Sequence, residues 1–133
     1  MFGSLDISTS GMTAQRTRLN IISANMANQY STVDAQGNYA PYRRRVPLFA
    51  PGDGHGSDMG VHVQDIEMDQ SPFRKEWDPG HKFADKDGYV SMPNIDPTIE
   101  MVNAMEASRA YEANIMAAEA TKSMINSALR LLA

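Results

Sequence analysis

Histidine is the side chain most often used for acid–base chemistry and metal binding near neutral pH, and this chain contains three. His55, His62 and His81 are scattered through the centre of the sequence, and none lies four residues from another. That spacing would place a zinc-binding pair on one helix face. The 133-residue chain also lacks cysteine, which excludes disulfides, thiol catalysis and cysteine-ligated zinc. We therefore predict no catalytic residue and no metal ligand among these groups.

The segment Asp85-Lys86-Asp87-Gly88 resembles part of a calcium-binding loop. When Gly88 is aligned with the invariant glycine of such a loop, Phe83 takes the place of the first carboxylate and Asn94 that of the bidentate glutamate. Two essential ligands are therefore missing. We predict a turn instead of a calcium site.

Glycines and arginines offer two further possibilities. Gly52, Gly54, Gly56 and Gly60 do not form the G-x-G-x-x-G pattern and do not open a helix, so no phosphate or cofactor site is predicted. The run Arg43-Arg44-Arg45 is too short for a nucleic-acid surface on a chain of net charge −4 and pI near 5.2. We predict a local salt bridge or a subunit contact for it. The order of serines, histidines and acids contains no nucleophile elbow, so an enzyme is not expected.

The distribution of proline and glycine divides the chain into three parts. All seven prolines lie between Pro41 and Pro97, whereas the two ends are nearly free of both residue types. This contrast predicts an α+β fold with an N-terminal helix within 1–30, a β-rich or irregular middle over 31–96 and a C-terminal helix within 97–133.

The N-terminal helix is predicted from apolar residues that recur every seven positions. These are Leu5, Met12, Leu19 and Met26. Ile22 lies on the same stripe. Gly11 is unfavourable inside a helix by about 1 kcal/mol relative to alanine, which indicates a late helix start or close packing there. Ser8 or Ser10 would cap a late start.

The C-terminal helix has a clear beginning. Asp96 is suited to the N-cap, Pro97 to the first helical position and Glu100 to the positive helix start. Two apolar rows follow: Met101, Ala104, Tyr111, Ile115, Ala118, Ile125, Leu129 and Leu132, and beside them Val102, Met105, Met116, Ala120, Met124 and Leu131. About 35 residues would make a helix roughly 52 Å long with a broad apolar surface.

The middle segment gives weaker signals. Residues 39–49 read as a hairpin arm at a sheet edge because of their prolines, and residues 60–68 alternate as a half-buried strand does. Residues 51–57 are predicted as a loop, with turns at 78–80 and 87–88.

Two arrangements of the long helices remain open at this point. In one, the chain folds its ends into an antiparallel helical hairpin against its own middle. In the other, the ends order fully only beside neighbouring subunits, because a two-helix pair buries just one narrow stripe of each helix. No window approaches the ~20 apolar residues of a membrane span, and the first residues lack the basic and apolar regions of a cleaved signal.

Specific motifs at both ends resemble a known family. The N-terminal ones are Ser10-Gly11-Met12 and Leu19-Asn20-Ile21-Ile22-Ser23-Ala24-Asn25-Met26-Ala27-Asn28. The C-terminal ones are Glu100-Met101-Val102, Ser108-Arg109-Ala110-Tyr111-Glu112-Ala113-Asn114 and Lys122-Ser123-Met124. Together they resemble the paired terminal signatures of bacterial flagellar rod and hook proteins. Met26 is a mild, volume-conserving departure from the leucine or isoleucine usual in that family.

The middle is similar to that of the proximal-rod members of the family. The matching stretches are Pro41-Tyr42-Arg43-Arg44, Asp78-Pro79-Gly80-His81, Ala84-Asp85, Gly88-Tyr89-Val90 and Pro93-Asn94. Lys82 stands where members often have proline. The resemblance covers nearly the whole chain.

The resemblance implies a structural subunit that polymerises in the proximal rod of the flagellar basal body, the axial drive shaft that transmits motor torque. It implies export without a cleaved signal peptide, a location in the rod crossing the periplasm, and terminal helices that form a coiled-coil-like tubular layer around the export channel. The implied partners are copies of the chain, other rod proteins, and nearby export-apparatus and ring components. No cofactor is implied.

We expect the assembly interface to lie on the two helices, and Asn25 and Asn28 to tie backbone groups where the first helix ends. The expected residues are Leu5, Met12, Leu19, Ile22, Asn25, Met26, Asn28, Met101, Met105, Arg109, Tyr111, Asn114, Ile115, Met124, Ile125, Leu129 and Leu132. The alternative function is a soluble helical adaptor or export-chaperone module that holds a partner helix in a groove.

Overall fold

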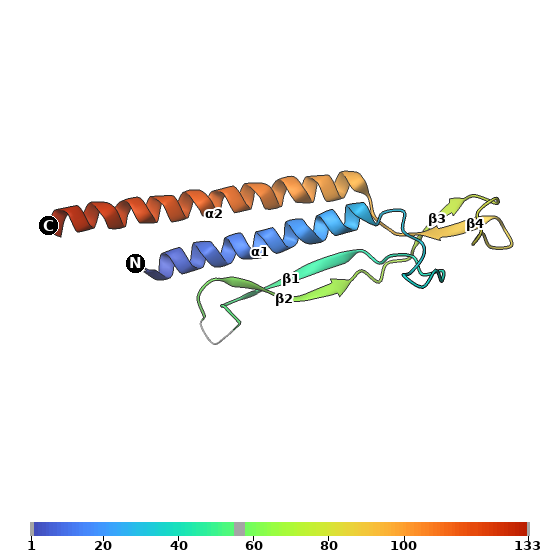
Figure 1. Ribbon diagram of the computed structural model, residues 1–133, viewed down its shortest axis with the longest axis horizontal. Helices are drawn as coiled ribbons and strands as arrows, with labels where there is room; N and C mark the ends of the chain where they lie inside the picture. The colour runs from blue at the N-terminus through green and yellow to red at the C-terminus, as the bar shows by residue number, and fades with distance from the viewer. Residues whose placement is uncertain (1, 55–57, 133) are drawn as a thin grey trace.

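The computed structural model describes residues 2–54 and 58–132. Within these residues two long helices enclose two small β-hairpins in the sequence (Figure 1). The elements are α1 (Phe2–Ala27), β1 (Arg45–Pro51), β2 (Val61–Met68), β3 (Arg74–Trp77), β4 (Tyr89–Met92) and α2 (Pro97–Leu132). The predicted α+β class is confirmed.

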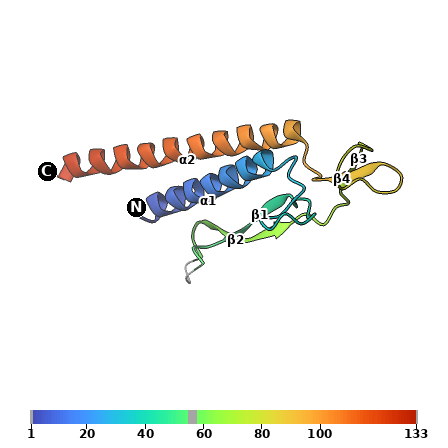
Figure 2. The same cartoon turned by 45° about the vertical axis from the view of Figure 1, so that its right-hand side comes forward.

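The two helices lie antiparallel, and α1 is the central element of the molecule. One side of α1 packs along α2, and another side packs against the β1–β2 hairpin (Figures 1 and 2). The β3–β4 hairpin lies beyond the end of the helix pair where α1 finishes and α2 begins. At the opposite end α2 extends past the start of α1. The two ends of the chain thus form an antiparallel helical hairpin, which packs against the middle segment through α1.

The predicted start of α2 is confirmed. The Asp96 carboxylate accepts hydrogen bonds from the backbone N–H groups of Thr98 (2.8 Å) and Ile99 (3.4 Å), as an N-cap does. Pro97 is the first helical residue.

The predicted late start of α1 is wrong. The helix already begins at Phe2, and Ser8 and Ser10 lie inside it. Their hydroxyls donate to the carbonyls of Ser4 (3.1 Å) and Ile7 (2.7 Å), a local bond that serine makes readily within a continuing helix. The other explanation considered for Gly11, close packing, is the one observed.

The β1–β2 hairpin is antiparallel, from Arg45 opposite Met68 to Pro51 opposite Val61, with a bulge between Leu48 and Phe49. The strand predicted over 60–68 is confirmed as β2, whereas the predicted arm over 39–49 begins only at Arg45. The preceding backbone turns back on residues after α1: Ala40 N–H donates to Thr32 and Tyr42 N–H to Ser31. Part of the predicted 51–57 loop, including His55, lies outside the described residues.

The β3–β4 hairpin pairs Arg74 with Met92 and Trp77 with Tyr89. These two strands have only four residues each, and the sequence pattern did not predict them. The turns expected between them are confirmed, since Asp78 N–H donates to the Gly88 carbonyl (2.9 Å) and Gly88 adopts a positive φ of 82°. The Asp85 carboxylate closes its own turn by accepting from the N–H groups of Asp87 and Tyr89.

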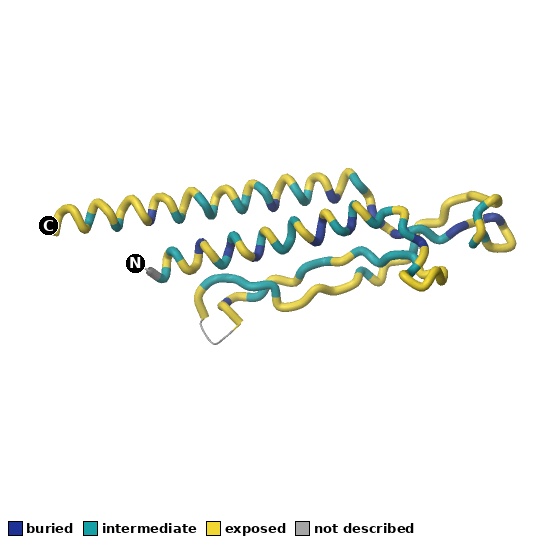
Figure 3. Tube along the Cα trace, in the orientation of Figure 1, coloured by how far each residue is buried: buried dark blue, intermediate teal, exposed yellow. Residues whose placement is uncertain are grey.

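The buried core is small, and much large apolar surface remains exposed (Figure 3). Most of the burial lies along α1 and at the junction of the two helices with the strands. In the part of the chain that the structure describes, no helix combines the length and the apolarity needed to cross a membrane.

Candidate functional site: the helix seam and the outer face of α2

The two helices meet along a seam of small and polar residues. Residues spaced by seven along α1 contact residues spaced by seven along α2, in the opposite direction. The Ser4 hydroxyl lies 3.2 Å from the Thr121 hydroxyl, and Gly11 packs on Asn114. Further along the seam, Asn25 donates to Glu100 (3.3 Å). Ala107, which lies midway between Asn114 and Glu100 on α2, is fully buried. Arg18 spans the rim of the seam to Glu106 at 3.0 Å.

Gly11 allows the two helices to approach closely. A Cβ atom at this position would lie 2.7 Å from the Asn114 amide nitrogen, closer than a Cβ atom approaches in real structures, so the Asn114 side chain would have to move. The unfavourable effect of glycine in a helix is therefore offset here by its contact with Asn114.

At the end of the seam a polar cluster around the buried Asn25 and Glu100 joins α1, α2 and the start of β1. We call it the hub, and it consists of Asn25, Tyr42, Arg44, Arg45 and Glu100. The Asn25 carboxamide donates to the Arg45 carbonyl (2.9 Å) and accepts from the Arg45 N–H (2.9 Å). It also donates to Glu100 and accepts from the Tyr42 hydroxyl (3.3 Å). One side chain therefore connects three elements that are far apart in the sequence.

Charge in the hub is balanced by an ion pair. The Glu100 side chain is 0% exposed, and the Arg44 guanidinium donates to its carboxylate through Nε at 2.6 Å. A buried carboxylate without such a partner would be very unfavourable. Burial also raises the pKa of the Tyr42 phenol, and the neighbouring Arg45 partly opposes this rise.

The contacts of the arginine run are local. Arg44 forms a salt bridge to Glu100, which is one of the two contacts predicted for this segment. Arg43 lies over the Phe73 ring at 4.1 Å and donates to the carbonyls of Asp69 and Ser71. The run thus fastens the entry of β1 to its surroundings.

Asn25 and Asn28 act as predicted at the end of α1. Asn25 holds the backbone of Arg45, and the Asn28 side chain donates to the Ala24 carbonyl at 2.8 Å. The carbonyl of Ala24, near the end of the helix, thus accepts from both the side chain and the backbone N–H (3.1 Å) of Asn28.

Large apolar side chains of α2 are exposed outside its contact with α1. We call this surface the outer face, and it consists of exposed Ile99, Met101, Val102, Met105, Met116, Met124, Leu129 and Leu131. Leu132 is also exposed, but it follows Ile125 by seven residues and continues the inward row of the helix. The inward stripe of the same helix is formed by smaller residues. It consists of Ala104, Ala107, Tyr111, Asn114, Ala118, Thr121, Ile125 and Ala128. The predicted helix is thus observed, but much of its apolar surface has no partner within the described chain.

The residues expected at an assembly interface fall into three groups. Ile22 and Asn25 are buried within the chain. Half-buried are Leu5, Met12, Leu19, Met26, Asn28, Tyr111, Asn114, Ile115 and Ile125. Exposed are Met101, Met105, Arg109, Met124, Leu129 and Leu132.

The sequence pattern did not predict Ser4, Glu100 and Thr121 as contact residues between the helices. A signal for some of them was present, because Glu100, Ala107, Asn114, Thr121 and Ala128 also recur every seven residues. Small and polar residues at that spacing are the mark of a close, polar seam rather than of an apolar one.

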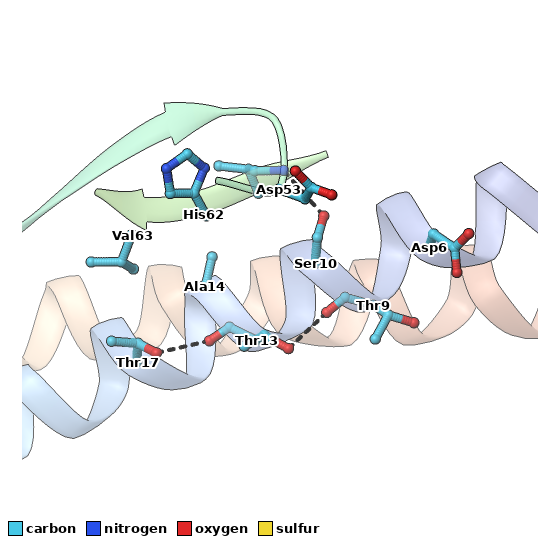
Figure 4. Close-up of a pocket in the computed structure, with 10 residues that line it drawn as sticks. Asp6, Thr9, Ser10, Thr13, Ala14, Thr17, Asp53, His62 and Val63 are labelled. Carbon is cyan, nitrogen blue, oxygen red and sulfur yellow. Dashed lines mark hydrogen bonds between the residues drawn. The ribbon is translucent and has the colours of Figure 1, made fainter. Parts of the chain in front are cut away.

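An open groove of about 460 Å³ lies between α1 and the β1–β2 hairpin (Figure 4). Thr9, Thr13 and Thr17 line it from the helix, and their hydroxyls bond back to the helix itself. Val61 N–H donates to the Ser10 hydroxyl at 3.1 Å, which fastens the hairpin to α1.

The described histidines have structural contacts. His62 Nδ1 lies 2.9 Å from the Gly52 carbonyl, and His81 Nδ1 accepts from the Phe83 N–H at 3.1 Å. No set of three or more His, Asp or Glu side chains positioned to hold a metal ion occurs in residues 2–54 and 58–132.

Both sides of the seam match families of known proteins. Residues 5–35 match the family model described as "Flagella basal body rod protein", and residues 86–131 match "Flagellar basal body rod FlgEFG protein C-terminal". The first region carries Gly11 and Asn25, and the second carries Asn114 and Glu100. The class of the chain is therefore that of the flagellar basal-body rod proteins, and the two signatures of that class contact each other within one chain.

Full-length relatives identify the family within this class. The chain is 39% identical to flagellar basal-body rod protein FlgC of Borreliella burgdorferi over 99% of this chain and 97% of that protein. It is 39% identical to FlgC of Bacillus subtilis (98% and 97% covered) and 42% identical to FlgC of Escherichia coli O6:H1 (95% and 93% covered). The chain belongs to the FlgC family of flagellar basal-body rod proteins. The resemblance seen in the terminal and central motifs is confirmed.

Proposed function

We propose that this chain is a structural subunit of the proximal rod of the bacterial flagellar basal body, with no catalytic role and no cofactor. Membership of the FlgC family supports this function. The single observation on the molecule that supports it best is the outer face of α2, where large apolar side chains point away from the rest of the chain.

Physical arguments connect the outer face to assembly. Exposed apolar residues are normal when single, whereas a row along a long helix is typical of a surface that another protein covers. Met105 is 51% exposed and Met116 is 63% exposed, although both belong to a 36-residue helix whose opposite side is packed. Methionine is flexible and adapts to several partner surfaces. A rod also needs repeated heterologous contacts, for which each subunit presents different surfaces.

We propose the following division of roles. Residues 1–30 and 97–133 are the assembly segments of an inner helical layer around the export channel, and residues 31–96 face outward. Of the expected interface residues, the exposed ones on α2 contact neighbouring subunits directly. The buried Ile22 and Asn25 act by holding the shape of the subunit.

The proposed partners are copies of this chain, other rod proteins, and nearby components of the export apparatus and the basal-body rings. The proposed location is the rod where it crosses the periplasm, reached by export without a cleaved signal peptide. We further predict that both helices become more protected from hydrogen exchange in isolated basal bodies than in the purified chain.

The function is tested by substituting the outer face and counting incorporation into basal bodies. In Met105→Ser with Met116→Ser, we expect incorporation to fall about tenfold or more, because two buried methionines each contribute about 1.5–3 kcal/mol at an interface. The measurement is quantitative immunoblotting of purified basal bodies against secreted and cellular protein.

Met68→Ser is the matched control. Met68 has the same side chain and a similar exposure of 55%, but it lies at the end of β2. We expect normal incorporation of this variant. If the helix variant assembles as well as the control, the outer face is not the assembly surface. If the chain is absent from basal bodies and instead forms a stoichiometric complex with a flagellar export substrate, the adaptor or chaperone function replaces the rod function.

A further inference from the structure

We propose that the hub is a register lock, which fixes how far α2 is shifted along α1. The proposal concerns the isolated subunit, so it does not depend on the proposed function. It follows from a contrast between the hub, whose contacts are specific, and the remainder of the seam, whose contacts are interchangeable.

The row of the seam that joins Ser4 to Thr121 and Gly11 to Asn114 discriminates only weakly between registers. If α1 moved by seven residues toward the end of α2, Ser4 would face Ala128 and Gly11 would face Thr121. Both new pairs consist of small residues, as does the present pair Ser4–Thr121, whereas the present pair Gly11–Asn114 joins a glycine to a carboxamide side chain. Along this row, glycine, serine, threonine and alanine take the place of the large interlocking side chains that normally penalise such a shift, and the larger Tyr111 and Ile125 lie in the neighbouring row.

The helix also offers room for the shift. α2 extends past the start of α1, so an unpaired stretch of inward-facing helix is available there (Figure 1). Ala128 and Ile125 lie on that stretch and are half-buried. A seven-residue movement corresponds to about 10 Å along the helix axis.

The hub, in contrast, can be satisfied in one register only. Asn25 is 1% exposed and bonds both backbone groups of Arg45 together with Glu100. In the shifted register Asn25 would face Ala107, and the carboxylate of Glu100 would lose this donor. Buried polar side chains are known to specify helix register in this way, because a wrong register leaves them without partners.

The lock has a geometric consequence. Arg45 is the first residue of β1 and Arg44 directly precedes it, so the hub fixes both helices relative to the strands as well as to each other. The outer face of α2 therefore has a defined axial position relative to the two β-hairpins. A subunit in the wrong register would present the same apolar residues about 10 Å away from their proper place.

Disulfide trapping measures the register directly. Because the chain has no native cysteine, only the two introduced cysteines can form a disulfide within it. Ser4→Cys with Thr121→Cys reports the observed register, and Ser4→Cys with Ala128→Cys reports the shifted one. In the otherwise unchanged chain, only the first pair is expected to cross-link efficiently under mild oxidation.

The lock is removed by Asn25→Leu, Arg44→Met and Glu100→Leu together, which replaces the three hub side chains that connect to α2 and leaves no buried charge without a partner. We expect cross-linking of the shifted pair to rise about tenfold in this background, with a matching loss of the native pair. The matched control carries the same three kinds of change on exposed helix positions: Asn20→Leu, Arg109→Met and Glu112→Leu. It should cross-link only in the native register.

Two results would overturn the lock. The first is a helical lock variant, by circular dichroism, that cross-links only in the native register. The second comes from Asn114→Ala, which alters the seam beyond the hub and leaves the hub intact. If this variant shifts register, the seam and not the hub sets the alignment. If the lock variant loses its helical signal, Asn114→Ala decides alone, and retention of the native register supports the proposal.

Discussion

The two faces of α2 contrast strongly in composition. The side that packs on α1 consists mainly of alanine, with Thr121, Asn114, Tyr111 and Ile125, and has the buried Glu100 at its start. The side turned away from α1 carries methionine, valine and leucine, many of them more than half exposed. In a self-contained helical hairpin the larger apolar residues would face the partner helix.

The two sides of the helix therefore have different roles. The inner side determines the shape of the subunit through close packing and specific polar bonds. The outer side is exposed in the subunit and would be buried only by contact with another molecule. The subunit alone therefore gains little from apolar packing along the seam, and its stability depends heavily on a few contacts near the hub.

The largest effect on the inner side is expected at the ion pair. Arg44→Met leaves the Glu100 carboxylate buried without its cation, so the free energy of unfolding should fall by about 3–5 kcal/mol. Urea unfolding followed by circular dichroism measures this. Arg74→Met is the control, because the Arg74–Glu76 pair is exposed and its N–O separation is 3.7 Å. This change should alter stability by less than about 1 kcal/mol. Equal effects of the two substitutions would contradict the central role of the hub.

A smaller effect on the free energy of unfolding is expected at Gly11, and its sign should depend on the residue at position 114. Gly11→Ala should destabilise the chain by about 1 kcal/mol, since the new methyl group meets the Asn114 side chain. In an Asn114→Ala background the clash disappears, and the same change should stabilise the chain by about 1 kcal/mol through helix propensity. A double-mutant cycle in urea unfolding gives the coupling between the two positions. Absence of coupling would show that the seam is looser than the structure indicates.

The smallest effect on the isolated subunit is expected on the outer face. Met116→Ser removes an exposed side chain, so the free energy of unfolding should change by no more than about 0.5 kcal/mol. The same urea measurement is suitable, with Ile22→Ser as the buried counterpart that should be strongly destabilising. A large loss of stability in Met116→Ser would mean that the outer face already has an internal partner.

The local features of the fold could be predicted from the sequence, because their causes are local. Asp96 and Pro97 define the start of α2 through cap chemistry, and the alternation over 61–68 defines β2 through its side-chain period. The strands β3 and β4 were missed because four residues are too few to show a period. Ser8 and Ser10 suggested a later start of α1 because serine is a common N-cap residue. The serine hydroxyl also forms hydrogen bonds to backbone carbonyls inside a helix, as it does here.

The candidate site could be predicted only in part. Periodicity showed that Leu5, Met12, Leu19 and Met26 share a stripe, but the row that meets α2 lies one residue earlier, about 100° around the helix. Periodicity identifies a face without saying what covers it. The hub escaped prediction because Asn25 and Glu100 are 75 residues apart, and only the folded chain brings them together.

The bonds of Asn25 to Arg45 have a consequence for the hairpin. Its carboxamide satisfies both the N–H and the C=O of the first residue of β1, as the peptide group of an adjacent strand would. The Asn25 side chain thus takes the place of a neighbouring strand at the edge of the two-stranded sheet. Unpaired edge strands pair with strands of other chains and lead to aggregation. At Arg45 the edge of β1 is already hydrogen-bonded within the subunit.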